Sequence, residues 1–248
     1  MTFAVRPIGL AKSAFVFDDV IASDVTNYNL RARAVAAGWD QVVPLIATTT
    51  VNSGIVLSAN ATSQYGFDTG TTFPAGTTLA LINNGFVIGM GGKGANGYIS
   101  GYAQQNGSPG GPALIARAAL TVTNNGVIGG GGGGGGGGAN NEAYGYGGGG
   151  GRSGRTASAG GTAGGAYPAH PGTFDSGGNG ANGGLGGTTS TGGDASNYTA
   201  GGGGGGGWGA AGGPGAAQPG FSGYRGPRGA AGVGNPHNPL GKNRTPRG

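Results

Sequence analysis

The residue types that carry catalytic and metal chemistry are scarce in this chain and poorly spaced. Glu142 is the only glutamate, Asp175 and Asp194 are isolated, and the two histidines, His170 and His237, each lie beside proline. Metal sites combine several Cys, His or carboxylate ligands, and glycosidases pair two carboxylates. Cysteine is absent, which excludes thiolate ligands and disulfides. The sequence therefore predicts neither an enzyme nor a metal site.

Glycine-rich stretches match nucleotide-binding patterns without the context that gives those patterns meaning. Residues 91–94 read Gly-Gly-Lys-Gly and lack the Lys-Ser/Thr pair of a phosphate-binding loop. The other runs have neither a strand-helix unit nor a downstream acidic residue for a ribose. We therefore expect no nucleotide and no other cofactor.

Binding chemistry is concentrated in segments that separate the glycine runs, at 98–109, 139–146, 166–176 and 188–200. They are rich in tyrosine, asparagine and serine, which give antibody loops a large contact area and adaptable hydrogen bonds. Loops on a rigid scaffold are also where binding residues usually lie. The alternative is that the tyrosines only cap the ends of the scaffold. The candidate binding residues are Tyr98, Tyr102, Gln104, Tyr144, Tyr146, Tyr167, His170 and Phe174.

Glycine must position these segments. Of the 67 glycines among 248 residues, seven lie in 1–88 and the other 60 (67 minus 7) in 89–248. Many fall three residues apart, as in 177–186 and 220–232. A period of three is that of a polyproline-II-type helix, which must bond to its neighbours because it has no internal hydrogen bonds. Uninterrupted runs such as Gly129–Gly138 fit helices surrounded on every side, so we predict a bundle of packed polyglycine-II helices.

A flexible linker or a collagen helix would account for the glycine content less well. Flexible linkers are rich in glycine, but a linker has no reason to keep the period of three or the alternation with tyrosine-rich segments. Collagen also has glycine at every third position. It needs about 15–20% proline or more, however, whereas this chain has 13 prolines and breaks the triplet at Gln218.

The bundle predicts where the loops lie. Consecutive antiparallel helices place successive loops at alternate ends. Counted from Gly89, the segments 98–109, 139–146 and 166–176 come to the free end, and 188–200, with Tyr198, to the end near the front domain. We therefore expect the eight candidate residues to form one shared patch at the tip.

The front part of the chain carries ordinary secondary-structure signals. A short helix is expected at about 25–37, because Ser23 or Asp24 can cap its start and Gly38 stands where helices end in a left-handed residue. Strands follow up to Ile88. The expected fold is mainly irregular and β, with a small N-terminal attachment domain (1–88) that contains one short helix and β-strands. The polyglycine-II bundle with distal loops (89–235) and a basic C-terminal tail (236–248) follow.

One strand pattern occurs twice. Residues 77–88 read as a strand, Asn-Asn-Gly and an apolar strand, and residues 119–128 repeat this 41 residues later, each copy running into glycine. Asn-Gly is typical of tight turns with positive φ angles. We expect both copies to be neighbours in one β-layer from which the glycine helices start. Their predicted core residues are Leu79, Leu81, Val87, Leu120, Val122 and Ile128.

Net charge and targeting signals limit the partners and the location expected for the protein. The formal net charge is +5, and basic residues crowd the C-terminal end. Basic tails can bind nucleic acid, but this one is short with few aromatics, so we expect a solvated tail and no nucleic acid. Residues 1–10 do not form a secretory signal, and no run approaches the ~18 apolar residues of a membrane span. A protein acting outside cells without signal or disulfides is typical of a virion component released by lysis.

With this alternation of glycine runs and variable loops over 89–234, the chain resembles the long-tail-fibre tip adhesins of T-even-like phages. Five stretches of the front part also look like the lead-in of glycine-rich tail proteins of siphophages: Asn29-Leu30-Arg31, Gly38-Trp39-Asp40, and the stretches 50–54, 73–76 and 81–85. The resemblance implies a virion protein of the tail fibre or tail tip that joins other tail proteins through 1–88, and it is compatible with a homo-oligomer. Its distal loops would contact an outer-membrane protein or polysaccharide of the bacterial surface.

Two further interpretations are compatible with the sequence. One is a purely structural glycine-rich virion or surface protein without a receptor of its own. The second is an ice-binding polyglycine bundle, which requires a regular flat face of Thr or Ala. The run 188–191 is too short for such a face.

Overall fold

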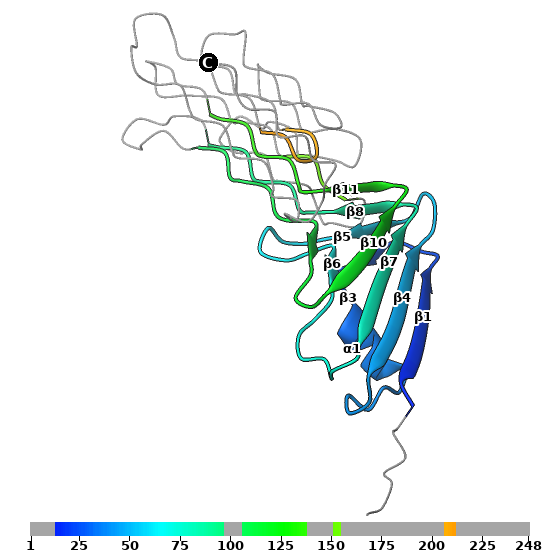
Figure 1. Cartoon of the computed structure of the whole chain (residues 1–248). Coiled ribbons are helices and arrows are strands. Elements are labelled where there is room, and N and C mark those ends of the chain that lie inside the picture. The colour runs from blue at the N-terminus through cyan, green and yellow to red at the C-terminus, as the bar shows by residue number, and fades with distance from the viewer. Residues whose placement is uncertain (1–12, 97–105, 138–150, 155–205, 212–248) are drawn as a thin grey trace, which may run out of the picture.

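Eleven strands and one helix make up the regular structure of the described residues, which are 13–96, 106–137, 151–154 and 206–211 of a computed structural model. The strands lie in three sheets (Figure 1). Sheet A contains β1 (Phe15–Ile21), β4 (Leu45–Val51), β7 (Thr78–Asn83) and β10 (Leu120–Asn124). Sheet B contains β2 (Val25–Thr26), β5 (Val56–Ser58), β8 (Phe86–Ile88) and β11 (Val127–Gly129). Sheet C contains β3 (Tyr28–Asn29), β6 (Phe67–Asp68) and β9 (Leu114–Ile115).

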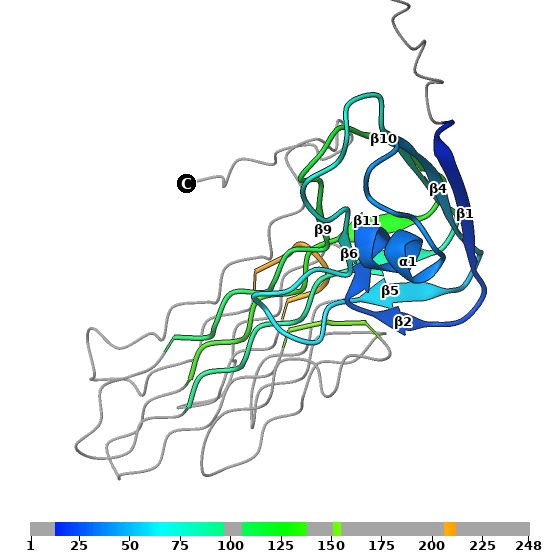
Figure 2. The ribbon, with the colours of Figure 1, turned by 90° about the horizontal axis from the view of Figure 1, so that it is seen from below.

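The chain visits the three sheets in turn. It passes from β1 through β2 and β3 to the helix α1 (Leu30–Ala36), and the next turn, β4 to β6, lies beside the first with every pair parallel. Parallel neighbours need a long crossover, and here the other two sheets supply it. The result is a three-sided β-solenoid. Figure 2, seen from below, shows α1 at the near end with β1 and β4 of sheet A along one side of it. The prediction of mainly β structure with one short helix is confirmed, and the parallel sheets are new.

The Asn-Asn-Gly units are corners between sheets and not the tight hairpin turns that we expected. β7 and β8 belong to different sheets and do not pair. Neither Gly85 nor Gly126 has a positive φ. A Cβ on Gly85 would overlap the backbone carbonyl of Ile55 in the preceding turn, and a Cβ on Gly126 would overlap that of Gly85. Glycine is therefore required by the close stacking of successive corners.

The pairing predicted for the two copies is confirmed. β7 pairs with β10 in sheet A and β8 with β11 in sheet B, both offset by 41 residues. Asn83 is fully buried, and its Nδ2 donates to Asn124 Oδ1 at 2.8 Å and to the carbonyl of Val127 at 3.1 Å. This amide ladder satisfies a buried polar side chain, which would otherwise cost roughly 1–3 kcal/mol.

Most of the predicted core residues lie in the core between the sheets. Leu79, Leu81 and Val87 are buried, and Leu120 and Ile128 pack against them partly buried. Val122 is wrong as a core residue, because 42% of it is exposed. It lies on β10, in the last turn, and sheet C ends one turn earlier at β9, so within the described chain no strand of sheet C covers it.

The helix is shorter than the predicted span of 25–37. It begins after Asn29, whose side-chain oxygen accepts from the backbone N–H of Ala32 at 2.9 Å. Residues 25–26 and 28–29 form β2 and β3 instead, because their backbone groups pair with the next turn of the solenoid. The predicted end is confirmed: Gly38 has a φ of 104°.

A polar cluster on the inner side of sheet A links the buried Tyr28 to a partly exposed ion pair. The Tyr28 side chain is 1% exposed, and its hydroxyl donates to Asp19 at 2.9 Å and lies 2.9 Å from Thr49 Oγ1. Arg33 forms an ion pair with Asp19 and lies over the Tyr28 ring. Burial raises the pKa of the Tyr28 hydroxyl. The hydroxyl thus stays protonated and remains a hydrogen-bond donor that links α1 to the sheet.

The predicted boundary at residue 88 does not separate the strands from the glycine segments. The chain leaves the solenoid after β8, returns to it as β9, and leaves again after β11. The change in composition led us to predict residues 114–129 in the bundle. They contain β9, β10 and β11, which belong to the three sheets.

Candidate functional site

The glycine segments bond laterally at every third residue. Backbone N–H groups of Gly89, Gly92 and Ala95 donate to the carbonyls of Gly129, Gly132 and Gly135 at 2.8–3.0 Å. The constant offset of 40 residues means that the two segments run parallel. Residues 107–111 run antiparallel to both, since Gly131 bonds to Gly111 and Gly134 to Ser108.

Glycine at positions 131, 132 and 134 is required by contact with neighbouring backbones. A Cβ on Gly131 would overlap the carbonyl of Met90, one on Gly132 that of Gly206, and one on Gly134 that of Lys93. The N–H of Gly132 also donates to the carbonyl of Arg152 at 3.0 Å. The segment 131–134 is thus bordered by four other stretches of the chain, at 89–95, 107–111, 151–154 and 206–211.

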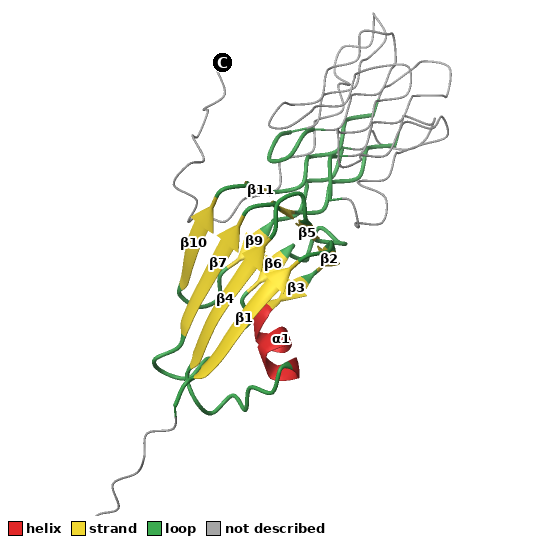
Figure 3. Cartoon of the chain, turned by 90° about the vertical axis from the view of Figure 1, so that its right-hand side faces the viewer, coloured by secondary structure: helices red, strands yellow, loops and turns green. Residues whose placement is uncertain are grey.

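All eight predicted binding residues fall outside the described residues, so they remain predictions. These are Tyr98, Tyr102, Gln104, Tyr144, Tyr146, Tyr167, His170 and Phe174. What the structure describes is the beginning of the segments that lead to two of the loops. Figure 3 shows these segments leaving from the end of the sheets where β11 and β5 lie, away from α1.

Trp208 joins the glycine segments to sheet B. Its side chain is 5% exposed and packs with Val56 and Ile88 on the outer face of that sheet. The Phe86 ring lies 5.7 Å from the Trp208 ring, and the guanidinium of Arg152 lies 3.5 Å above it. The indole Nε1 donates to the carbonyl of Ser153 at 3.3 Å. This aromatic and cationic stack fixes segments 151–154 and 206–211 against the solenoid.

The outer face of sheet A carries apolar and threonine side chains. Val16, Val20 and Ile46 are 62%, 61% and 43% exposed. Val16 lies beside Ile46, and Val20 lies in a row with Thr50, Ile82 and Thr123. Asp18 is the one charged residue at the outward positions of these four strands. This face is therefore exposed at three apolar residues and otherwise carries mainly threonine.

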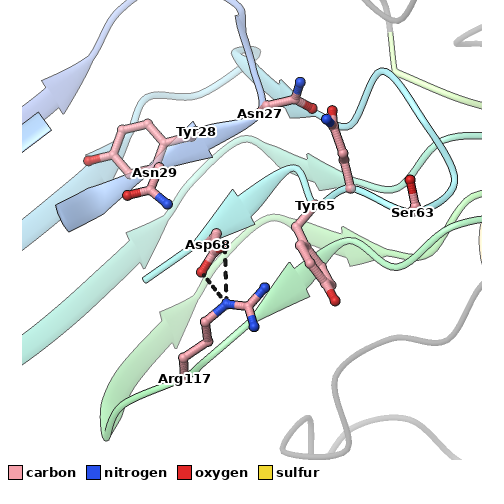
Figure 4. A pocket seen from close by; sticks show the side chains of 8 residues that line it. Asn27, Tyr28, Asn29, Ser63, Tyr65, Asp68 and Arg117 are labelled. Carbon is pink, nitrogen blue, oxygen red and sulfur yellow. Dashed lines mark hydrogen bonds and ion pairs between the residues drawn. The ribbon is translucent and has the colours of Figure 1, made fainter. Parts of the chain in front are cut away.

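A pocket of about 270 Å³ lies beside sheet C (Figure 4). Its walls come from the corner before β3, the loop before β6 and the segment after β9. Arg117 Nε donates to both carboxylate oxygens of Asp68, at 3.1 and 3.2 Å, and its guanidinium lies 5.4 Å from the centre of the Tyr65 ring. The lining residues are Asn27, Tyr28, Asn29, Ser63, Gln64, Tyr65, Asp68 and Arg117.

Neither metal-binding clusters nor membrane-spanning helices occur in the described residues. No group of three or more His, Cys, Asp or Glu side chains there is placed to hold a metal ion. None of the helices in this part is long and apolar enough to cross a membrane.

Sequence reasoning missed both the Trp208 junction and the pocket. Trp208 meets Arg152 and Phe86 across 56 and 122 residues of sequence (208 minus 152 and 208 minus 86). Asp68 and Arg117 are 49 residues apart. The one available signal was an isolated tryptophan directly after the run Gly201–Gly207, since a large aromatic side chain has no room inside a polyglycine bundle.

Comparison with known proteins supplies the family. The sequence matches the model of a family described as phage tail fibre adhesin Gp38, over residues 17–245. The fold is similar to the crystal structure of the gp37-gp38 adhesin tip complex of the bacteriophage S16 long tail fibre. The TM-score is 0.53 at 20% sequence identity, covering 91% of this chain and 79% of that one. None of the curated proteins matches the sequence. The chain therefore belongs to the phage tail fibre adhesins and is a component of the virion's tail fibre.

Proposed function

We propose that this chain is the receptor-binding tip of the fibre, with loops that contact a bacterial surface molecule from a polyglycine-II scaffold. The observation that carries this is the parallel registration of 89–95 with 129–135. Because both segments run the same way from neighbouring strands, they lead toward the same end. That arrangement supports a shared tip for the loops at 98–109 and 139–146.

The polyglycine-II part of the proposal is supported by hydrogen bonding and packing. Lateral bonds at every third residue match the three residues per turn of such a helix. Overlap with neighbouring backbones at Gly131, Gly132 and Gly134 matches helices with no room for side chains. A scaffold of this kind is rigid without disulfides, and rigidity lowers the entropy cost of presenting a binding surface.

A triple alanine variant tests the receptor-binding patch. We expect Tyr102→Ala, Tyr144→Ala and Tyr167→Ala together to abolish adsorption of the purified protein to host cells, because aromatic anchors carry much of the energy of such patches. The melting temperature should stay that of the wild type, and Tyr198→Ala, predicted to lie at the other end, should keep adsorption. Adsorption that survives the triple change would favour a purely structural role for the protein.

We also propose that the solenoid attaches the adhesin to the fibre through the outer face of sheet A. Support comes from the exposed apolar side chains of Val16, Val20 and Ile46. The similar solved structure is itself a complex of an adhesin with a second tail fibre protein, gp37. Apolar patches of this kind mark protein interfaces.

Introducing charge on this face tests the attachment. Val16→Lys with Val20→Lys should prevent co-purification with the cognate fibre protein, because two ammonium groups would have to be desolvated at the interface. Adsorption of the free protein to cells should persist. The control pair Ala22→Lys and Ser23→Lys adds the same charges at exposed positions beyond β1. Equal co-purification of both variants would remove sheet A from the interface.

A further inference from the structure

The pocket beside sheet C has a built-in pair of opposite charges. Asp68 is held from two sides: its Oδ1 accepts from the backbone N–H of Gly70 at 2.7 Å, and Arg117 Nε donates to both carboxylate oxygens. Arg117 is held in turn, because its backbone N–H donates to Thr69 Oγ1 at 2.9 Å. The two charged groups therefore stand in fixed positions with no net charge between them.

Polar groups around this pair remain available to a ligand. The terminal amino groups of Arg117, the side-chain amide of Gln64 and the hydroxyl of Tyr65 have no hydrogen-bond partner within the described part of the chain. Each donates, and the amide and the hydroxyl also accept. Figure 4 shows Tyr65 and Arg117 side by side along one side of the pocket, with Asp68 next to Arg117.

The two asparagines contribute donors. The side-chain oxygen of Asn27 accepts from the backbone N–H of Asn60 at 3.1 Å, and that of Asn29 accepts from Ala32 at 2.9 Å. With both oxygens occupied, the NH₂ groups are the free ends of these amides. The pocket thus combines amide and guanidinium donors with a carboxylate acceptor and an aromatic wall.

We propose that this pocket binds a neutral saccharide through a single pyranose ring. A sugar hydroxyl both donates and accepts, so it can donate to Asp68 while accepting from Arg117 or from an asparagine amide. The Arg117 guanidinium lies over the Tyr65 ring, so the C–H groups of the sugar would pack on the apolar surface of Tyr65 that the guanidinium leaves uncovered. The volume of about 270 Å³ suits one ring and is below the usual size of a pocket for larger ligands.

The charge arrangement favours a neutral ligand over an anion. A phosphate or carboxylate needs unopposed positive charge, but Asp68 lies 3.1–3.2 Å from Arg117 Nε and would repel it. No other Lys or Arg lines the pocket. All the lining residues belong to the solenoid and none comes from the tyrosine-rich segments, so this proposal does not depend on the receptor-binding patch proposed above.

Saturation-transfer NMR on the full-length protein tests this proposal. The probes are the methyl glycosides of glucose, galactose and N-acetylglucosamine at millimolar concentration. We expect signal transfer to at least one of them, and its loss in Gln64→Trp, which fills the pocket from an exposed position. The matched control, Thr121→Trp, places the same ring at an exposed position on sheet A and should keep the signal. Tyr65→Ala should also remove it, by deleting one wall.

The other outcomes overturn the proposal. Absence of transfer from all three glycosides shows that the pocket takes none of these rings. Transfer that persists in both Gln64→Trp and Tyr65→Ala places the sugar elsewhere. If Gln64→Trp instead abolishes co-purification with the fibre protein and leaves saccharide binding intact, the pocket receives a side chain of that partner. The triple tyrosine variant should keep the saccharide signal, so failure here and failure of the loop patch remain distinguishable.

Discussion

Replacing Gly132 by valine is expected to lower the free energy of unfolding of the packed glycine segments by more than about 3 kcal/mol, at or above the upper end of ordinary overpacking. The added Cβ would overlap the carbonyl of Gly206. A flexible side chain could move aside, but Gly206 is held by its own hydrogen bond to Gly133. Thermal and chemical denaturation of the purified protein measure the loss.

The control for this variant places the same side chain where there is room. Thr121→Val adds valine to an exposed position of β10, where β-branched residues fit the strand. Its melting temperature should match that of the wild type. Equal tolerance of valine at residues 132 and 121 would contradict a bundle packed backbone to backbone.

The second large effect is expected for Trp208→Ala. We expect this change to lower the free energy of unfolding by about 3–5 kcal/mol, the range for truncating a buried large aromatic side chain. The change removes the ring that lies against Phe86 and Arg152 and uncovers the outer face of sheet B. Arg152, a residue that is only 6% exposed, would also lose the aromatic partner of its guanidinium.

Limited proteolysis distinguishes this junction from an ordinary core position. We expect cleavage of Trp208→Ala within the glycine segments under conditions in which the wild type resists. The solenoid should remain intact, because its core is a separate cluster around Leu57 and Leu81. Trp208→Phe keeps an aromatic ring, so its stability and its resistance to proteolysis should fall far less. Wild-type stability of the alanine variant would mean that Trp208 does not hold the two parts together.

Two features of the fold could be predicted from short sequence patterns. The Asn-Asn-Gly repeat identified partners that pair across 41 residues, and Gly38 ended the helix as expected. The parallel winding was missed because the same unit is typical of hairpins, whereas here Asn83 turns inward to bond to Asn124. The helix start was misplaced because pairing of Val25 and Tyr28 with the next turn outweighs a plausible cap at Ser23 or Asp24.

The candidate sites were predictable to different degrees. The tyrosine-rich loops were inferred from composition alone and lie mostly outside the described residues, so they remain a prediction. The Asp68–Arg117 pair and the Trp208–Arg152 stack depend on how turns of the solenoid and glycine segments meet in space. No spacing rule links Asp68 to Arg117, 49 positions away in a solenoid whose turns vary in length. None links Arg152 to Trp208 either, which lie 56 positions apart on two separate glycine segments.

The continuity of sheet B with the glycine segments has a mechanical consequence. β8 and β11 run on directly into the parallel segments 89–95 and 129–135. The same two stretches of backbone therefore cross in register from the solenoid to the glycine segments. Tension applied at the far end is therefore transmitted along covalent backbone into the strands. The hydrogen bonds between these two stretches lie across the direction of pull, so they share the load instead of opening one after another. An adhesin built in this way can resist drag on a tethered particle without a disulfide at the joint.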